Sequence, residues 1–306
     1  MPTYVHVSVP ASTANLGPGF DCLGLALGLY NTVEMTALDD GFEMEIEGEG
    51  AERLRRDRGN LIVRAADALW ERIGQPPIGL KVKCANGIPP GSGLGSSAAA
   101  VVAGLVAANA LSGDPLSKTE LLRLAYQLEG HPDNAAAALF GGLTMVSATG
   151  DDLLVDVLNV PPLEIAIALP DVRFSTRQAR QALPKRVPLD DAVFNIGRTL
   201  FVVRALQLGD YDLLRRAMAD RLHEPYRRKL IPGFDAAAQA AREAGAAAVA
   251  LSGAGPSVAA FAPDGHAKIA DAMKAAFEAK GVKCQTFVLP VDRQGVQISI
   301  QRLAHP

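Results

Sequence analysis

Residues 88–98 read Ile-Pro-Pro-Gly-Ser-Gly-Leu-Gly-Ser-Ser-Ala, and this stretch says more about the fold than any other part of the chain. Gly91, Gly93 and Gly95 alternate through a short loop, and the alanine-rich residues 97–111 are expected to form a helix. Glycines adopt positive φ and expose their backbone N–H groups. The N-terminus of a helix adds free N–H donors and the positive end of its dipole. The stretch therefore predicts a phosphate-binding loop.

Two other nucleotide-binding motifs do not fit this loop. A Walker A loop requires Lys followed by Ser or Thr after its last glycine, whereas Ser96 and Ser97 follow Gly95 here. The dinucleotide-binding fingerprint places its third glycine one residue later than the spacing found here. A plain turn between a strand and a helix is the simpler alternative. The length and particular composition of the run favour phosphate binding.

Composition limits the classes of protein that this chain can belong to. Its 306 residues are 49% hydrophobic and 21% charged, which suits two domains of ordinary size with a sizeable core. A net charge of −3 and short basic clusters argue against a nucleic-acid partner. The three scattered cysteines suit reduced thiols, and no uncharged apolar stretch reaches about 18 residues. No signal peptide is recognisable at the N-terminus, so we expect a cytoplasmic protein without a membrane segment.

Strand and helix patterns alternate along the whole chain, which predicts a mixed fold of the α+β or α/β class. We expect strands over residues 5–9, 43–47, 81–84, 153–158, 163–169, 247–251, 258–261, 282–288 and 296–300, and helices over 60–73, 97–111, 117–129, 192–208, 211–222, 234–244 and 267–280. A capping box at Ser175 predicts one more short helix. The Pro161-Pro162 pair suggests a boundary between two domains, 1–160 and 161–306.

Five segments, in order along the chain, resemble the GHMP kinases (galactokinase, homoserine kinase, mevalonate kinase and phosphomevalonate kinase). Residues 89–99 resemble the second signature of that family, and residues 252–257 resemble the third. Residues 10–21, 129–134 and 224–227 resemble the homoserine kinase branch in particular. Any one match is weak by itself, but five in the family's order are specific.

The resemblance implies an α+β, two-domain GHMP kinase fold. Its N-terminal domain would be similar to the second domain of ribosomal protein S5, and its C-terminal domain would be a ferredoxin-like sandwich. ATP would lie between them. The implied reaction transfers the γ-phosphoryl group of ATP to the side-chain hydroxyl of L-homoserine and supplies O-phospho-L-homoserine for threonine synthesis. A mevalonate-type kinase and a non-catalytic nucleotide-binding homologue are the alternatives.

The resemblance also assigns nucleotide and metal contacts. The triphosphate would be held by Pro89, Pro90, Gly91, Ser92, Gly93, Leu94, Gly95, Ser96, Ser97, Ala98 and Ala99. The family's Mg²⁺ position combines a loop serine with a carboxylate, and Ser97 and Glu129 match it best. Both carry hard oxygen ligands that suit Mg²⁺. Ser96 is an alternative to Ser97 that the sequence leaves open.

An amino-acid substrate needs a pocket that carries both signs of charge. By resemblance, Asn15 and Asp21 would contact the amino and hydroxyl end of L-homoserine. Arg180 and Arg227 would bind its carboxylate, because a guanidinium pairs with a carboxylate through two hydrogen bonds. His131 is expected to line the same pocket.

The expected catalytic mechanism depends on which residue occupies the position of the family's catalytic base. Other GHMP branches use an Asp as the base on the acceptor hydroxyl, and Asn134 occupies the matching position here. We therefore expect catalysis by positioning and electrostatics, with Asn134, Thr176 and Arg180 near the transferred group. Asp133 would overturn this view if its carboxylate faced the acceptor. The resemblance makes a homodimer an expectation, whereas the residues alone leave oligomeric state and feedback open.

Overall fold

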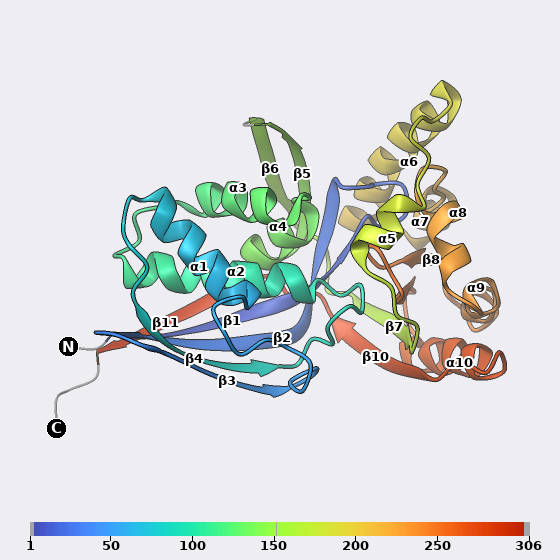
Figure 1. Ribbon diagram of the computed structural model, residues 1–306. Coiled ribbons are helices and arrows are strands. Elements are labelled where there is room, and N and C mark those ends of the chain that lie inside the picture. Colours follow the sequence, from blue (N-terminus) through green and yellow to red (C-terminus); the bar gives the residue numbers. More distant parts are fainter. Residues whose placement is uncertain (1–2, 151, 303–306) are drawn as a thin grey trace.

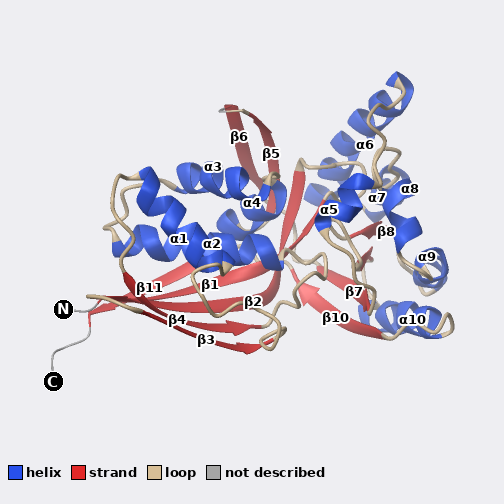
Figure 2. Cartoon of the chain, viewed as in Figure 1, coloured by secondary structure: helices blue, strands red, loops and turns tan. Residues whose placement is uncertain are grey.

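The structure is a computed structural model, which describes residues 3–150 and 152–302 (Figure 1). Residues 1–2, 151 and 303–306, which belong to the two predicted domains, lie outside the described residues. The described chain forms two sheets, each covered by helices, so the α+β prediction is confirmed (Figure 2). No helix within those residues combines the length and the apolar character that crossing a bilayer requires.

The first sheet has seven strands, five of them in the order β11-β1-β2-β4-β3, while β5 pairs with β2 and β6. Its strands are β1 (Thr3–Ala14), β2 (Leu23–Leu38), β3 (Phe42–Gly48), β4 (Gly79–Asn86), β5 (Leu143–Thr149), β6 (Asp152–Leu158) and β11 (Gln297–Arg302). The helices of this half are α1 (Leu61–Arg72), α2 (Ser96–Leu111), α3 (Lys118–Glu129) and α4 (Asp133–Phe140). Figure 1 shows them gathered over the strands on the N-terminal side of the molecule.

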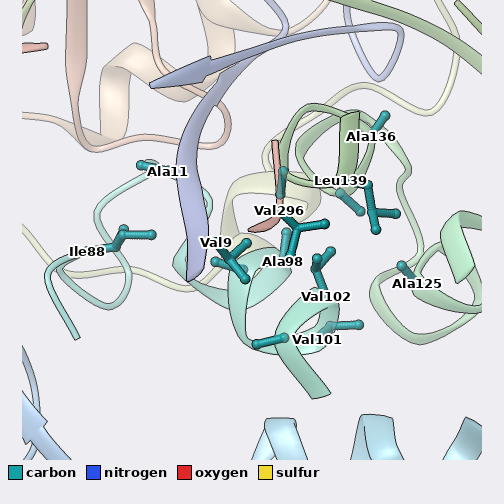
Figure 3. Packing of buried hydrophobic residues seen from close by; sticks show 14 of the residues in the cluster. Val9, Ala11, Ile88, Ala98, Val101, Val102, Ala125, Ala136, Leu139 and Val296 are labelled. Atoms are coloured by element: carbon teal, nitrogen blue, oxygen red, sulfur yellow. The ribbon is translucent and has the colours of Figure 1, made fainter. Parts of the chain in front are cut away.

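Helix α2 occupies the centre of the N-terminal half and is buried along almost its whole length. Its small residues allow neighbouring backbones to approach closely. At Gly104, for example, a Cβ would lie only 2.1 Å from the carbonyl oxygen of Ile62 in α1. Val9 of β1 and Val101 and Val102 of α2 belong to one buried cluster (Figure 3). The packing therefore holds the N-terminus of α2, where the glycine loop ends, in a fixed place.

The second sheet has four strands in the order β10-β7-β9-β8, and every neighbouring pair is antiparallel. Its strands are β7 (Glu164–Pro170), β8 (Ala248–Leu251), β9 (Val258–Phe261) and β10 (Cys284–Pro290). The helices of this half are α5 (Thr176–Gln181), α6 (Leu189–Leu208), α7 (Tyr211–Ala217), α8 (Glu224–Arg227), α9 (Phe234–Glu243) and α10 (His266–Glu278), with the short 3₁₀ helix η1 (Arg228–Leu230) after α8. One buried cluster joins α9 and α10 to the strands, as in an α/β sandwich.

The sequence patterns did not predict β2, α4, β5 or α8. Two further features differ from the sequence-based expectation. The helix expected over 211–222 ends at Ala217, because the Asp220 carboxylate accepts hydrogen bonds from the amides of Leu222, His223 and Glu224 and so starts α8 instead. The last strand, β11, pairs with β1 and thus returns to the first sheet, although it follows the C-terminal half in sequence. The division at residues 160 and 161 stays a prediction.

Candidate active site

A cavity of about 370 Å³ lies where the glycine loop, the segment between β1 and β2, the start of α4 and the turn after β8 meet. All of the residues predicted for substrate, metal and catalysis line it, namely Asn15, Asp21, Ser97, Glu129, His131, Asn134, Thr176, Arg180 and Arg227. They come from both halves of the chain. The fold thus gathers in one place residues that are separated by as much as two thirds of the sequence.

The glycine loop borders this cavity and ends at Gly95, the N-cap residue of α2. Gly95 has φ 73° and provides no side-chain hydrogen bond to cap the helix, so the first amides of α2 are left for a ligand. A Cβ at Gly95 would lie 2.1 Å from Oγ of Ser12, and a Cβ at Gly93 would lie 2.5 Å from the carbonyl oxygen of Ser252. Positive φ and close packing therefore both require glycine here. This geometry suits an anion, as in other phosphate-binding loops.

Not every residue of the predicted loop reaches this cavity. Leu94 and Ala99 are fully buried in the core, and Pro89 is also buried. Pro90 instead lines a second cavity of about 210 Å³, which also touches Gly91 and Ser97. That cavity is mostly apolar, with walls from β3, β4 and the start of α1, and sequence reasoning missed it. It adjoins the glycine loop at Gly91, Ser96 and Ser97.

Ser97 and Glu129 form the predicted pair of hard oxygen ligands. The hydroxyl of Ser97, in the first turn of α2, donates a hydrogen bond of 2.8 Å to Oε1 of Glu129, the last residue of α3. Across residues 3–150 and 152–302, no group of three or more His, Cys, Asp or Glu side chains is arranged to hold a metal. Two protein oxygens beside a phosphate cradle fit Mg²⁺, which keeps several waters and takes other ligands from substrate phosphates.

The charged end of the cavity contains a close ion pair. Arg180 of α5 donates two hydrogen bonds to the Asp21 carboxylate, at 2.9 and 2.8 Å. Asp21 has φ 55°, and its amide donates to Oδ1 of Asn15, whose Nδ2 donates to the Gly253 carbonyl oxygen at 2.7 Å. Asn15 therefore ties the loop after β1 to the turn after β8 and fixes where Asp21 points.

Arg227 is almost fully buried, with 2% of its surface exposed. Its Nη1 lies 3.3 Å from the Gly253 carbonyl oxygen, and its guanidinium lies 5.0 Å from the centre of the Phe20 ring. Its Nε has no hydrogen-bond partner among the described residues. Burial, and then the neighbouring charge of Arg180, lower the pKa of Arg227 to about 10, so it is still charged at neutral pH. A buried cation with an unused donor is a site for an anion.

His131, Asp133 and Asn134 form a connected turn at the start of α4. The buried Asp133 accepts hydrogen bonds at Oδ1 from Nδ1 of His131 (3.0 Å) and from the amide of Asn134 (2.8 Å). Burial alone would lower the pKa of His131, but the Asp133 carboxylate outweighs it and raises that pKa. Asn134 accepts a hydrogen bond of 2.9 Å from Ser12 at Oδ1. Asn134 is thus held by its neighbours at the wall of the cavity.

The turn after β8 is joined directly to the glycine loop. The hydroxyl of Ser252, which is fully buried, donates to the Gly93 carbonyl oxygen at 2.7 Å. The amide of Ser257 donates to the Ser92 carbonyl oxygen, and the amide of Gly253 donates to that of Ala14. Both segments were singled out in the sequence for their glycines, and their contact shows how one supports the other.

Comparisons with known proteins agree with this arrangement. The family profile "GHMP kinases N terminal domain" matches residues 60–142, and "GHMP kinases C terminal" matches residues 202–279. This chain belongs to the GHMP kinase family. The first matched segment carries α2 with Ser97, and the second carries α8 with Arg227. Asp21 and Arg180 lie outside both matched segments.

Named relatives cover nearly the whole of this GHMP kinase. It is 48% identical over 279 residues to a homoserine kinase from Moorella thermoacetica, covering 91% of this chain and 94% of that protein. It is 44% identical to a homoserine kinase from Carboxydothermus hydrogenoformans, covering 96% of this chain and 97% of that protein. The crystal structure of homoserine kinase from Cytophaga hutchinsonii superposes with a TM-score of 0.87 at 35% identity, with 97% of each chain covered.

Sequence reasoning missed two aromatic residues that support the charged end of this kinase's cavity. The Phe20 ring stacks on His223 with centroids 5.1 Å apart, and Arg180 and Arg227 both lie against Phe20. Burial lowers the pKa of His223 and keeps it neutral, with Nε2–H donating to the Gly17 carbonyl oxygen at 2.8 Å. The spacing could have identified His223, because a residue four positions before Arg227 lies on the same face of a helix turn.

Proposed function

We propose that this GHMP kinase transfers the γ-phosphoryl group of ATP to the side-chain hydroxyl of L-homoserine, producing O-phospho-L-homoserine. The observation that carries the proposal is the pairing of two features in one cavity. One end has the exposed amides of a phosphate-binding loop. The other has the Asp21–Arg180 pair and the anion-seeking Arg227, which together match the ammonium and carboxylate groups of an amino acid. The homoserine kinases among its relatives support the same substrate.

The nucleotide end of the cavity would bind Mg²⁺–ATP. The amides between Gly91 and Ala98 are available for the phosphates, and the apolar cavity that shares Gly91 and Ser97 has a suitable size and lining for the base. Ser97 and Glu129 would hold the Mg²⁺ ion, with Ser96 as the alternative hydroxyl. When bound, Mg²⁺ neutralises phosphate charge and lowers the barrier to attack on the γ-phosphorus.

The acceptor end would bind L-homoserine by its head group. Arg227 and Arg180 would take the carboxylate, Asp21 and Asn15 the amino and hydroxyl end, and His131 the adjoining wall. Because Arg227 is buried and rigidly placed against Phe20, a carboxylate that reaches it loses water but gains strong charge-assisted hydrogen bonds. Fixing the head group also fixes the direction of the side-chain hydroxyl.

Catalysis would then depend on alignment and charge. Asn134, held by Ser12, would orient the acceptor hydroxyl without removing its proton, because an amide is not a base near neutral pH. Thr176 and Arg180 would stabilise negative charge on the transferred phosphoryl group from the α5 side. Asp133 accepts two hydrogen bonds from its own turn, an arrangement that supports a structural role over that of a base.

A Mg²⁺-dependent ADP-release assay with four acceptors tests the proposal. L-Homoserine should give the highest kcat/KM, with L-serine lower by about 10- to 200-fold because it lacks one methylene. Mevalonate carries a carboxylate but no ammonium group, so it should be lower by about 10⁴-fold, because nothing in it pairs with Asp21 once Arg180 binds the carboxylate. L-Threonine serves as a secondary-alcohol comparison and should also be poor. Highest activity on mevalonate would indicate a mevalonate-type kinase, and no ADP release with any acceptor would indicate a non-catalytic homologue.

A further inference from the structure

A separate charged cavity of about 480 Å³ lies between α7, the start of α8, the end of α9 and the outer edge of β8, and we call it the β8-edge cavity. Figure 1 shows these elements in the C-terminal half of the molecule. No residue that lines this cavity also lines the candidate active site. Its charged lining residues are Arg215, Asp220, Glu224 and Arg242, and none of them has a part in the proposed phosphoryl transfer.

The outer edge of β8 brings a backbone amide without an acceptor to this cavity. The amide of Ser252 donates to the Ser257 carbonyl oxygen beside the start of β9, and the direction of hydrogen bonding alternates along an antiparallel strand. The backbone groups of Val249 and Leu251 therefore face away from β9, and the amide of Leu251 donates to Glu224. The amide of Val249 has no acceptor among the described residues, although Val249 is only 4% exposed. Buried amides are almost always paired, so this one indicates a ligand.

The same cavity offers charged groups of both signs. Arg215 and Arg242 line it and are exposed, and the ion pair of Arg215 with Asp212 is also exposed, so a ligand can replace it at little cost. Glu224 presents a buried carboxyl, whose Oε2 accepts a hydrogen bond of 2.9 Å from the amide of Leu251, while no donor in the described chain reaches Oε1. Burial raises the pKa of this carboxyl to about 7, so a bound cation would hold it ionised at neutral pH.

We propose that the β8-edge cavity binds a small zwitterion of the amino-acid class. The amide of Val249 and the guanidinium of Arg242 hold its carboxylate, and Glu224 holds its ammonium group. A carboxylate accepts charge-assisted hydrogen bonds from a guanidinium and also accepts from a backbone amide. An anion without an ammonium group would leave Glu224 unpaired, and an amine without a carboxylate would leave the amide of Val249 without an acceptor. Only a ligand that carries both charges satisfies all three groups.

Binding in this cavity would also affect the substrate end of the active site. Glu224 lies three residues before Arg227 in α8, and its partner Leu251 lies two residues before Gly253. The carbonyl oxygen of Gly253 accepts hydrogen bonds from Nη1 of Arg227 at 3.3 Å and from Asn15 at 2.7 Å. A ligand on Glu224 would therefore fasten α8 to β8 and steady Arg227. This consequence rests on the proposed function, because it requires that Arg227 binds the substrate's carboxylate.

Equilibrium dialysis of radiolabelled glycine against the full chain tests for the site. Glycine is the smallest zwitterion of the proposed class. Acetate and methylammonium carry one charge each, so displacing the label should take concentrations at least about 10-fold higher than with unlabelled glycine. No binding of glycine, or displacement by acetate at the same concentrations as by glycine, would overturn the proposal.

Side-chain variants separate this cavity from the substrate site, which can also bind an amino acid. Arg242→Ala and Glu224→Gln should each raise the Kd of glycine by about 10-fold, because each removes one charged partner. Arg216→Ala, at an exposed position of α7 outside the cavity, is the control. Arg227→Ala should leave glycine bound in the cavity. Binding that Arg227→Ala abolishes and the two cavity variants leave unchanged would place glycine at the substrate site and overturn the proposal.

Val249→Pro removes the amide hydrogen itself. Proline is tolerated in an edge strand where the N–H would face away from the neighbouring strand, as it does at Val249. The Kd of glycine should rise by about 10-fold in this variant, and circular dichroism would show that it is folded. An unchanged Kd in the folded variant would overturn the role of the amide.

The KM for L-homoserine tests the connection to the active site. With the cavity saturated with glycine, this KM should fall by about 5-fold, and Glu224→Gln should abolish the fall. A rise in the KM would mean that glycine competes at the substrate site, and it would overturn the connection, as would an unchanged KM. A chain that binds glycine in the cavity but phosphorylates no L-homoserine would refute the proposed function and leave the cavity assignment standing, so the two failures are distinguishable.

Discussion

Asp21 and Arg180, which are 159 positions apart in the chain, form a two-hydrogen-bond ion pair across the mouth of the substrate end of the cavity. About a third of each side chain is exposed and the rest is shielded from water, so each charge needs a new partner when the pair opens. An amino acid can replace both halves of the pair, because its ammonium satisfies Asp21 while its carboxylate satisfies Arg180. An alcohol without these groups offers neither charge a new partner, so opening the pair for it would leave both charges unpaired. The pair thus provides a physical basis for selecting a zwitterion.

Replacement of Arg227 tests the carboxylate assignment. Arg227→Ala should raise the KM for L-homoserine by about 10- to 100-fold, since a charge-assisted hydrogen bond to a buried anion is lost. The KM for ATP should change little, because Arg227 does not line the apolar pocket proposed for the base. Arg228→Ala, at an exposed neighbour, is the matched control. Equal increases in the KM for L-homoserine and the KM for ATP would show that Arg227 does not bind the substrate's carboxylate.

Replacement of Glu129 tests the metal assignment. Glu129→Gln keeps the size of the side chain and a hydrogen-bond acceptor for Ser97 but removes the charge. The Mg²⁺ concentration for half-maximal activity should rise by about 10-fold, in line with the loss of one charged ligand oxygen. Titration of activity against Mg²⁺ at saturating ATP measures this. Glu71→Gln, on the exposed side of α1, is the control, and an unchanged Mg²⁺ dependence for Glu129→Gln would exclude it as a ligand.

Local sequence patterns were sufficient to predict the glycine loop and most of the helices around it. The reason is physical: positive φ at Gly93, the free N-terminus of α2 and the capping box at Ser175 are decided by residues close in sequence. The family resemblance added residues such as Arg227, whose own neighbours in sequence, Arg228 and Lys229, suggest only a basic surface. The structure instead buries Arg227.

Contacts between distant segments could not be predicted in the same way. The Asp21–Arg180 pair and the Phe20–His223 stack depend on how the two halves pack, and no periodicity encodes that. The pairing of β11 with β1 of the first sheet could not be predicted either, because a short alternating strand fits either sheet equally well. The apolar cavity beside the glycine loop was missed because its walls come from several separate segments.

Replacement of Asp133 tests whether a general base operates. Asp133→Asn keeps an acceptor for the amide of Asn134, so kcat should fall by no more than about 10-fold if the carboxylate is structural. The pKa of His131, which the carboxylate raises, should fall in the variant, and NMR titration of the imidazole would show it. A loss of kcat by several orders of magnitude at unchanged KM would instead identify Asp133 as the base on the acceptor hydroxyl.

The buried carboxyl of Glu224, at the start of α8, should make the protein less stable as the pH rises. Burial raises its pKa to about 7, although the amide of Leu251 donates to it. In the unfolded chain a Glu ionises near pH 4.3, so between about pH 4.5 and 7 the folded state holds a proton that the unfolded state has lost. The free energy of unfolding therefore falls across that window, by on the order of 3–4 kcal/mol in total, and does not recover above it. Glu224→Gln should remove this dependence and make the protein more stable at pH 8, while keeping an acceptor for Leu251.

Urea unfolding at pH 5 and pH 8 measures the effect, with Glu243→Gln on the exposed side of α9 as the control. An identical pH dependence in the unmodified chain and Glu224→Gln would show that Glu224 is ionised in the folded protein at the same pH as in the unfolded chain.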